Sequence, residues 1–164
     1  MSHMFRFKLF FWYFRHFKVA MIGYLKPRLI KLTAQDIVIC LPLTRRSKNH
    51  LNSMYFGALS VGADLAAGLH GFYHADLAHC KVALVFKSFS AQFLRRPEKD
   101  VYFVCNEGET VKAMIQETKK TKKRINRPIH INAYTDYPEQ TNKVAEFILE
   151  LSVKITFVPD KNWE

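Results

Sequence analysis

The chain has 164 residues, of which 49% are hydrophobic and 14% aromatic, and this composition excludes a disordered polypeptide. Its length suits one domain with a sizeable core. The formal net charge of +11 favours an anionic partner, such as a phosphorylated ligand, nucleic acid or an acidic membrane surface. Charge alone does not choose among these partners.

The first segment, residues 4–25, is predicted to form one amphipathic helix that ends before Pro27. The sequence divides accordingly into an N-terminal amphipathic helix, 1–25, and a main domain, 26–164. Four cationic residues fall in a stripe about 80° wide on this helix, namely Lys8, Arg15, Lys18 and Lys26. They interrupt the apolar run, so we expect neither a transmembrane helix nor a secretory signal. The helix either lies in a membrane interface or packs on its own domain or on a partner subunit.

The rest of the chain alternates between strand-like and helix-like patterns. We predict strands at 36–44, 81–96, 99–106, 127–136 and 143–159, a central helix from Ser53–Gly57 to Gly71 or His74, and a basic helix over 107–124. Ser53 is the expected N-cap of the central helix. The weight of strand after this helix predicts an α+β fold, with an antiparallel sheet packed on one helix.

Small residues crowd the central helix: Gly57, Ala58, Gly62, Ala63, Ala66, Ala67 and Gly68. A glycine inside a helix costs about 1 kcal/mol relative to alanine. A surface of small side chains lets a curved sheet approach closely on several sides. The composition therefore predicts a helix wrapped by a sheet.

One carboxylate, Asp64, stands in the middle of this apolar helix. Burying an unpaired carboxylate costs several kcal/mol, roughly, so its pKa should rise. Asp64 is then a candidate general base near neutral pH, or a nucleophile. The structural alternative is a carboxylate that pairs with a basic residue or caps a backbone group across a dimer interface.

Residues 49–68 resemble the loop and helix of hotdog-fold thioesterases of the phenylacetic-acid-pathway type, in which an Asn, a Gly and an acidic residue have the spacing of Asn49, Gly57 and Asp64. The resemblance is closer to an uncharacterised thioesterase-like branch with an N-terminal helical extension, through Phe56–Ala58 and the strand segment 87–104. It implies a hotdog fold, in which an antiparallel sheet wraps a long central helix. It covers about residues 25–157.

The resemblance implies hydrolysis of an acyl-CoA or acyl-carrier-protein thioester, by carboxylate-assisted attack of water. Asp64, Asn49 and Gly57 would be catalytic, and Tyr55, Phe56, Ala58, Arg95 and Arg96 would bind substrate. Backbone N–H groups near Gly57 would bind the oxyanion. Active sites of this family form between two subunits, so Asn49 and Asp64 would come from different chains of a homodimer or dimer of dimers. Coenzyme A enters as part of the substrate, and no cofactor or metal is expected.

The sequence departs from the family pattern where the central helix begins. Tyr55 and Phe56 replace the His and first Gly of the His-Gly-Gly segment, and Phe has less φ freedom than Gly. This departure motivates an alternative, a non-catalytic acyl-thioester-binding or membrane-associated hotdog protein. For Asn49 the alternative is a turn residue.

The run Lys119–Arg124, together with Arg95 and Arg96, is the sharpest basic cluster. It suits the phosphates of coenzyme A or an acidic carrier protein, or else it is a solvated helix face. Nucleic acid is the third-ranked partner, because no binding motif accompanies the charge.

His70, His74, Asp76 and His79 are interpreted as incidental residues of an exposed helix end, since no catalytic Glu joins the histidine pair. Cys40, Cys80 and Cys105 are predicted to be buried structural thiols, which suits a reducing compartment. We therefore expect a cytoplasmic protein of lipid metabolism, with peripheral contact at the inner membrane face through the N-terminal helix as a further expectation.

Overall fold

The computed structural model describes residues 3–157, with side chains from residue 5 onward. The described residues form one six-stranded antiparallel sheet in the order β1-β2-β4-β5-β6-β3. The elements are α1 (His3–Tyr13), η1 (Phe14–Lys18), α2 (Ala20–Leu25), β1 (Arg28–Leu32), β2 (Ile37–Leu41), α3 (Phe56–Leu77), β3 (Lys81–Phe93), β4 (Val101–Cys105), α4 (Gly108–Thr121), β5 (Ile125–Tyr134) and β6 (Lys143–Phe157).

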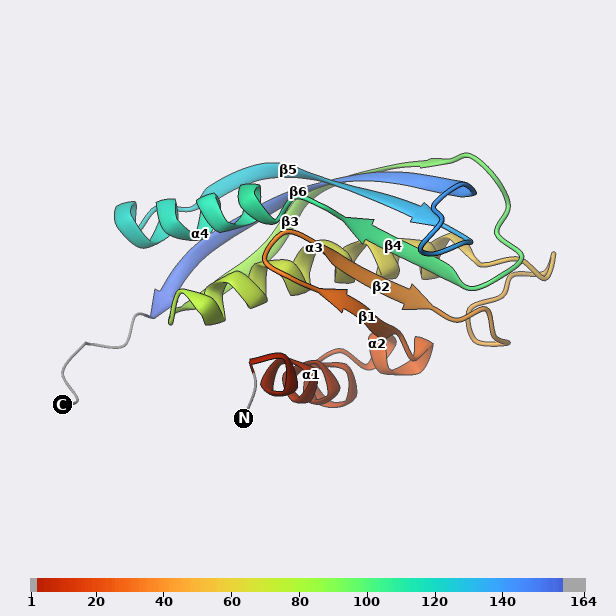
Figure 1. Ribbon diagram of the computed structural model, residues 1–164, viewed down its shortest axis with the longest axis horizontal. Coiled ribbons are helices and arrows are strands. Elements are labelled where there is room, and N and C mark those ends of the chain that lie inside the picture. The colour runs from red at the N-terminus through yellow and green to blue at the C-terminus, as the bar shows by residue number, and fades with distance from the viewer. Residues whose placement is uncertain (1–2, 158–164) are drawn as a thin grey trace.

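The sheet curls around α3, and this arrangement confirms the predicted α+β hotdog fold (Figure 1). The small residues of α3 permit the close approach. A Cβ at Gly62 would overlap the buried ring of Phe103 on β4, and one at Gly71 would overlap Leu84 on β3. Helix α3 therefore lies at the centre of the core, in contact with strands from both halves of the sheet.

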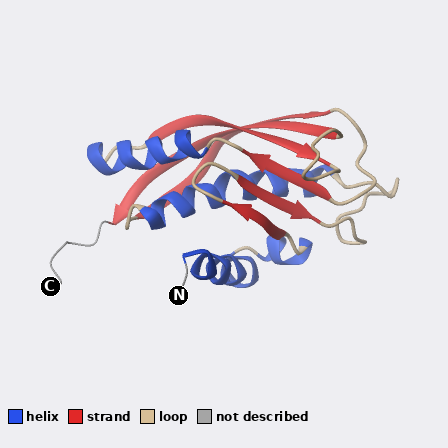
Figure 2. Cartoon of the chain, viewed as in Figure 1, coloured by secondary structure: helices blue, strands red, loops and turns tan. Residues whose placement is uncertain are grey.

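The N-terminal extension, residues 3–25, covers the side of α3 that the sheet leaves open (Figure 2). Phe7 contacts Tyr73, and Phe10 and Phe14 both contact Phe72 of α3, with ring centroids 5.6 to 5.8 Å apart. Phe7 and Phe11 belong to the same hydrophobic cluster as the sheet. The extension thus packs on its own chain, although its division from the main domain stays a prediction.

The prediction of one continuous helix over 4–25 is wrong. The chain passes from α1 into the π-helical turn η1 and then breaks at Val19, which is extended with φ −135° and ψ 96°. Helix α2 folds back on η1, where Gly23 lies against the Arg15 backbone and the Arg15 guanidinium donates to the Pro27 carbonyl at 3.0 Å. Because of the break, the predicted stripe from Lys8 to Lys26 does not run along one helix.

Strand β1, Arg28–Leu32, is absent from the predicted elements. It pairs antiparallel with β2 at one edge of the sheet, and of its residues only Leu32 is buried. Its basic, exposed composition hides the period-two pattern that identifies a half-buried strand. The other predicted strands and helices are present with shifted ends, and α3 continues to Leu77.

Candidate active site

Three hollows follow α3 from its N-terminus to its C-terminus. The first, of about 520 Å³, lies where α3 begins. It is lined by most of the predicted substrate-binding side chains together with one predicted catalytic residue: Asn49, Tyr55, Phe56, Arg95 and Arg96. His50, Phe93 and Leu94 also line it, although they are not among the site residues predicted from the sequence. The fold therefore gathers residues from the loop before α3 and the loop after β3.

Asn49 orders the turn that leads into α3. Its side-chain oxygen accepts hydrogen bonds from the Leu51 and Ser53 backbone amides at 2.9 and 3.2 Å, and from the Ser53 hydroxyl at 3.2 Å. Ser53 is fully buried and is not the N-cap of α3, which corrects that prediction. The N-cap is Tyr55, because the Tyr55 amide is fixed to the Ser47 carbonyl and the helix begins one residue later.

The first turn of α3 presents backbone N–H groups without a side-chain cap. Within the described residues, Tyr55 makes no side-chain cap hydrogen bond. Its ring lies against Gly57 and packs at a tilt against the Phe56 ring, with 4.6 Å between centroids, and Phe56 is 58% exposed. The amides of Phe56, Gly57 and Ala58 thus form the positive end of a helix dipole beside an aromatic surface. Such a site can bind a developing oxyanion.

Arg95 and Arg96 lie at the same hollow but already have partners. The Arg95 guanidinium donates to the Asn142 side chain at 2.9 Å, and Arg96 forms an exposed ion pair with Glu98 at 2.8 Å. The prediction that they form one basic cluster with Lys119–Arg124 is wrong. The loop joining β3 to β4 lies at one end of the molecule and the C-terminus of α4 at the other (Figure 1).

The second hollow, of about 200 Å³, contains Asp64. Its other walls are apolar and come from three elements: Phe14, Val19 and Ile22 from the extension, Gly68 and Phe72 from α3, and Leu84 and Phe86 from β3. Burial raises the pKa of the Asp64 carboxyl to about 6, and no charged or hydrogen-bonding neighbour among the described residues opposes that shift. Asp64 is thus a partly buried carboxylate without an ion-pair partner in this part of the chain.

Asp64 and Asn49 do not meet within one chain. Asp64 lies eight residues after Phe56 on α3, which is about 12 Å along the helix axis, and the two hollows share no lining residue. One small reacting group cannot contact both places. The geometry is compatible with the expectation that the two residues act from different chains.

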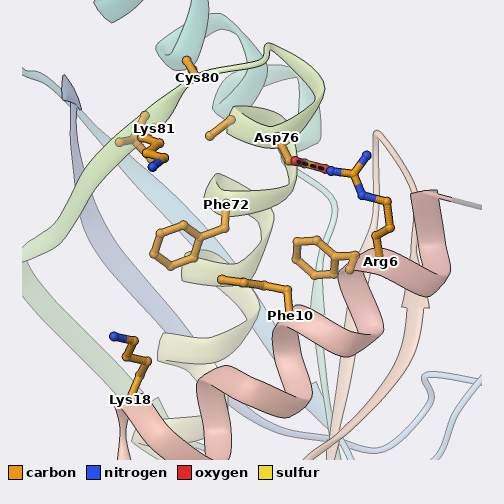
Figure 3. A pocket seen from close by; sticks show the side chains of 10 residues that line it. Arg6, Phe10, Lys18, Phe72, Asp76, Cys80 and Lys81 are labelled. Carbon is orange, nitrogen blue, oxygen red and sulfur yellow. Dashed lines mark ion pairs between the residues drawn. The ribbon is translucent and has the colours of Figure 1, made fainter. Parts of the chain in front are cut away.

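The third hollow is the largest of the three, at about 780 Å³, and lies between the extension and the C-terminal half of α3. Phe10 of α1 and Phe72 of α3 face each other in it, and Lys18 and Lys81 lie along one side (Figure 3). Arg6 pairs with Asp76 at 3.8 Å on the other side. Because Phe72 lines this hollow and the Asp64 hollow, the two are adjoining compartments, of which the third carries charged side chains at its sides.

The prediction that the C-terminal end of α3 is exposed is wrong for two of its histidines. His70 and His74 are buried, and their Nε2 atoms lie 3.3 and 2.9 Å from the Thr33 and Ala34 carbonyls of the β1–β2 turn. Burial lowers both pKa values, that of His70 to about 4, so the rings are neutral donors that attach α3 to this turn. His79 alone is exposed, as predicted.

Other chemistry-bearing groups add nothing to these hollows. Among residues 5–157, no three His, Cys, Asp or Glu side chains are grouped so as to hold a metal ion. The three cysteines are buried, as predicted, and burial raises the pKa of Cys105 to about 12. In the described part of the chain, no helix has the length and apolar character needed to cross a bilayer.

Solved structures with the same fold include several described as thioesterases. A protein from Shewanella oneidensis proposed to be a thioesterase is 13% identical, with a TM-score of 0.75, over 96% of this chain and 98% of its own. One from Pseudomonas aeruginosa, of unknown function and also proposed to be a thioesterase, is 20% identical with a TM-score of 0.72, over 88% and 93%. The PaaI protein of the Escherichia coli phenylacetic acid degradation operon is 17% identical with a TM-score of 0.56, over 87% and 89%.

No protein-family profile matches the sequence, and no curated protein matches it. The identities to the solved structures are low, so the shared feature is the fold, and its coverage includes the N-terminal extension in the Shewanella protein. The chain therefore has the hotdog fold that these solved structures share.

Proposed function

We propose that the protein hydrolyses acyl thioesters, with an acyl-CoA or an acyl-carrier protein as substrate. The observation that carries the proposal is Asp64, a carboxylate with a pKa of about 6 in an otherwise apolar hollow of a hotdog fold. At neutral pH it is mostly ionised and is a stronger base than an ordinary carboxylate. It would take a proton from water as the water oxygen attacks the thioester carbon; the C–S bond then breaks and the thiolate is protonated.

The oxyanion of that reaction requires hydrogen-bond donors. The first-turn amides of α3 at Phe56, Gly57 and Ala58 supply them without a side-chain cap. They lie about 9 to 12 Å along α3 from the Asp64 of the same chain. We therefore infer that the amides and Asn49 of one copy act with Asp64 of another.

Strand β3 offers the edge for such a dimer. Among the described strands it pairs only with β6, so 13 residues of backbone remain open at the end of the sheet. Val85, Phe89 and Phe93 on it are each about half exposed. An open edge of this length is a template for pairing with a second copy.

The apolar walls of the Asp64 hollow, continued by the Phe10 and Phe72 rings of the adjoining hollow, favour an acyl chain as the group that is bound. From Asp64 they lead along α3, beneath the aromatic rings of the extension, to the hollow beside Lys18 and Lys81. Apolar walls with few polar groups are typical of ligand pockets. An acyl chain would lie along α3, with its carbonyl near Asp64.

Acyl binding without hydrolysis is the second candidate. It rests on Phe56, whose exposed ring packs on Tyr55 at the first turn of α3, where a glycine stands in the resembling thioesterases. A bulky side chain there narrows the approach of a carbonyl to the amides.

The test is hydrolysis of short, long and aromatic acyl-CoAs by the wild type and by Asp64→Asn. We expect Asp64→Asn to lower kcat/KM by about 100-fold or more. Glu109→Gln is the control for the same carboxylate-to-amide change, because Glu109 lies on α4 away from these hollows and its surface pair with Lys112 contributes little; it should stay within about twofold. Equal activity of Asp64→Asn and wild type would reject the mechanism. Binding of acyl-CoA without turnover would instead support the second candidate.

A further inference from the structure

The N-terminal extension has two apolar faces, and the fold uses only one of them. Phe7, Phe11, Ile22 and Leu25 are at most 5% exposed and pack into the core. Away from this packed face, the extension carries seven large side chains that are 45 to 66% exposed: Phe5, Leu9, Trp12, Tyr13, Phe17, Met21 and Tyr24. Seven large apolar side chains exposed on one segment of about twenty residues are unusual for a surface without a partner.

The charge of the same segment is wholly positive. Residues 3–25 contain four Lys and Arg and no Asp or Glu. Lys8 and Lys18 are exposed on this segment, Lys26 is exposed directly after it, and the Lys18 ammonium lies 5.6 Å from the centre of the Tyr13 ring. Cations beside aromatic rings fit a partner that is apolar and carries dispersed negative charge.

We propose that the outer face of the extension docks on the surface of an anionic lipid bilayer. Trp and Tyr favour the boundary between lipid headgroups and acyl chains, and Lys and Arg are attracted to anionic headgroups. None of the described helices can span the bilayer, so the extension would lie in the interface plane. It forms an outer surface of the molecule, away from β5 and β6 (Figure 1), so docking leaves the sheet free.

A second copy of the chain is the less suitable occupant. A two-fold interface places the same surface on both sides, so two wholly cationic segments would face each other. Like charges across an interface disfavour association. A bilayer with acidic headgroups supplies the opposite charge and accepts the aromatic side chains.

The experiment is co-sedimentation of the full chain with phosphatidylcholine vesicles, with and without one quarter phosphatidylglycerol. We expect binding to the anionic vesicles that weakens as salt is raised. The pair Trp12→Ser/Phe17→Ser should lower the bound-to-free ratio about tenfold or more. Leu51→Ser/Leu77→Ser is the matched control, because it removes two apolar side chains of similar exposure outside the extension, and it should bind as the wild type does.

Charge reversals separate docking by this face from attraction by net charge. Lys8→Glu/Lys18→Glu should lower binding about 30-fold or more, because each substitution removes an attraction to the anionic headgroups and adds a repulsion. Lys120→Glu/Lys123→Glu changes the net charge equally at the end of α4 and should have a small effect. Equal loss from both pairs would overturn the proposal.

Two further results would also overturn it. One is equal sedimentation with neutral and anionic vesicles. The other is a wild type that self-associates but does not bind vesicles, and whose self-association is lost in Trp12→Ser/Phe17→Ser. The partner of the exposed side chains would then be a second copy of the chain. Trp163→Phe leaves Trp12 as the single tryptophan, so its emission should shift to shorter wavelength with anionic vesicles only. Circular dichroism confirms that each variant is folded.

Discussion

On one side of α3, His70 and His74 are buried and each donates to a carbonyl of the β1–β2 turn. On the other side, Asp64 is partly buried among apolar residues and has no such partner in the described part of the chain. Burial shifts the pKa of all three groups toward the neutral form. In that form the Nε2 atom of each histidine has a carbonyl partner, although His70 Nδ1 is buried with no hydrogen-bond partner among the described residues. Asp64 instead leaves a whole carboxyl group facing a hollow. We infer that the histidines serve the fold and that Asp64 serves a ligand.

Of the substitutions that test this contrast, removal of a buried histidine should have the largest effect on stability. His70→Ala removes a fully buried ring and should lower the free energy of unfolding by about 3 kcal/mol, because the cavity it leaves collapses only in part. Urea denaturation measures this loss. His79→Ala, at an exposed position just after α3, should change stability by less than about 0.5 kcal/mol. A loss below 1 kcal/mol for His70→Ala would contradict a structural role.

Asp64→Asn should act in the opposite direction. The folded-state pKa of Asp64 is about 6, above its ordinary value of 3.8, so folding disfavours the ionised carboxylate. This cost is fully present above pH 6 and vanishes as pH falls below 3.8. A neutral amide avoids it, so we expect about 2 kcal/mol of stabilisation at pH 8 and almost none at pH 4.

The measurement is denaturation of both proteins at the two pH values, with Glu109→Gln on α4 as the exposed control carboxylate. Asp64→Asn would then be more stable yet inactive, which distinguishes a functional carboxylate from a structural one. If the substitution destabilises the protein at pH 8, Asp64 has a structural partner and the comparison is wrong.

Lowering the pH should reduce the stability that the buried histidines contribute. His70 has a folded-state pKa near 4, below its ordinary 6.5, so the folded state resists protonation there. Stability that is present above pH 6.5 is lost as pH falls toward 4. The nearby His74 adds to this loss, since its pKa is also lowered. From pH 7 to pH 5, His70 should contribute about 1 to 2 kcal/mol of the loss.

His70→Phe isolates that contribution, because it keeps a buried ring of similar size without a titratable group. The wild type and the variant are unfolded in urea across the pH range. The difference in their free energies of unfolding should shrink below pH 6.5. Parallel curves would mean that His70 does not titrate with folding.

These contacts mark the limit of what the sequence alone predicts. The small residues of α3 predict a wrapped helix, because close approach is a local property of Gly62 and its neighbours. Burial of His70 depends on Thr33, 37 residues earlier, and the bend at Val19 depends on Arg15 reaching Pro27. Such long-range contacts leave no local pattern. For the same reason the sequence identifies Asp64 as unusual and predicts an N-terminal extension, but it does not predict that the extension covers Asp64.

Two glycines of α3 provide the smallest and most local test. A Cβ at Gly62 would overlap the Phe103 ring, which is buried and cannot move away without cost. Gly62→Ala should therefore destabilise the protein by about 1 kcal/mol, despite the better helix propensity of alanine. A Cβ at Gly68 would meet Phe86 and Leu84 at 3.8 to 3.9 Å, which is ordinary contact. Gly68→Ala, beside the Asp64 hollow, should stabilise by about 0.5 to 1 kcal/mol.

The pair is compared by thermal and urea unfolding, since each variant makes the same chemical change on the same helix. Stability changes of opposite sign would mean that α3 is close-packed against the sheet at Gly62, whereas open space remains beside Gly68 and Asp64. That space is what an acyl chain would need. If Gly68→Ala also destabilised the protein, the wall of the Asp64 hollow would have no room for an added methyl group, and a ligand could enter only after the extension had moved.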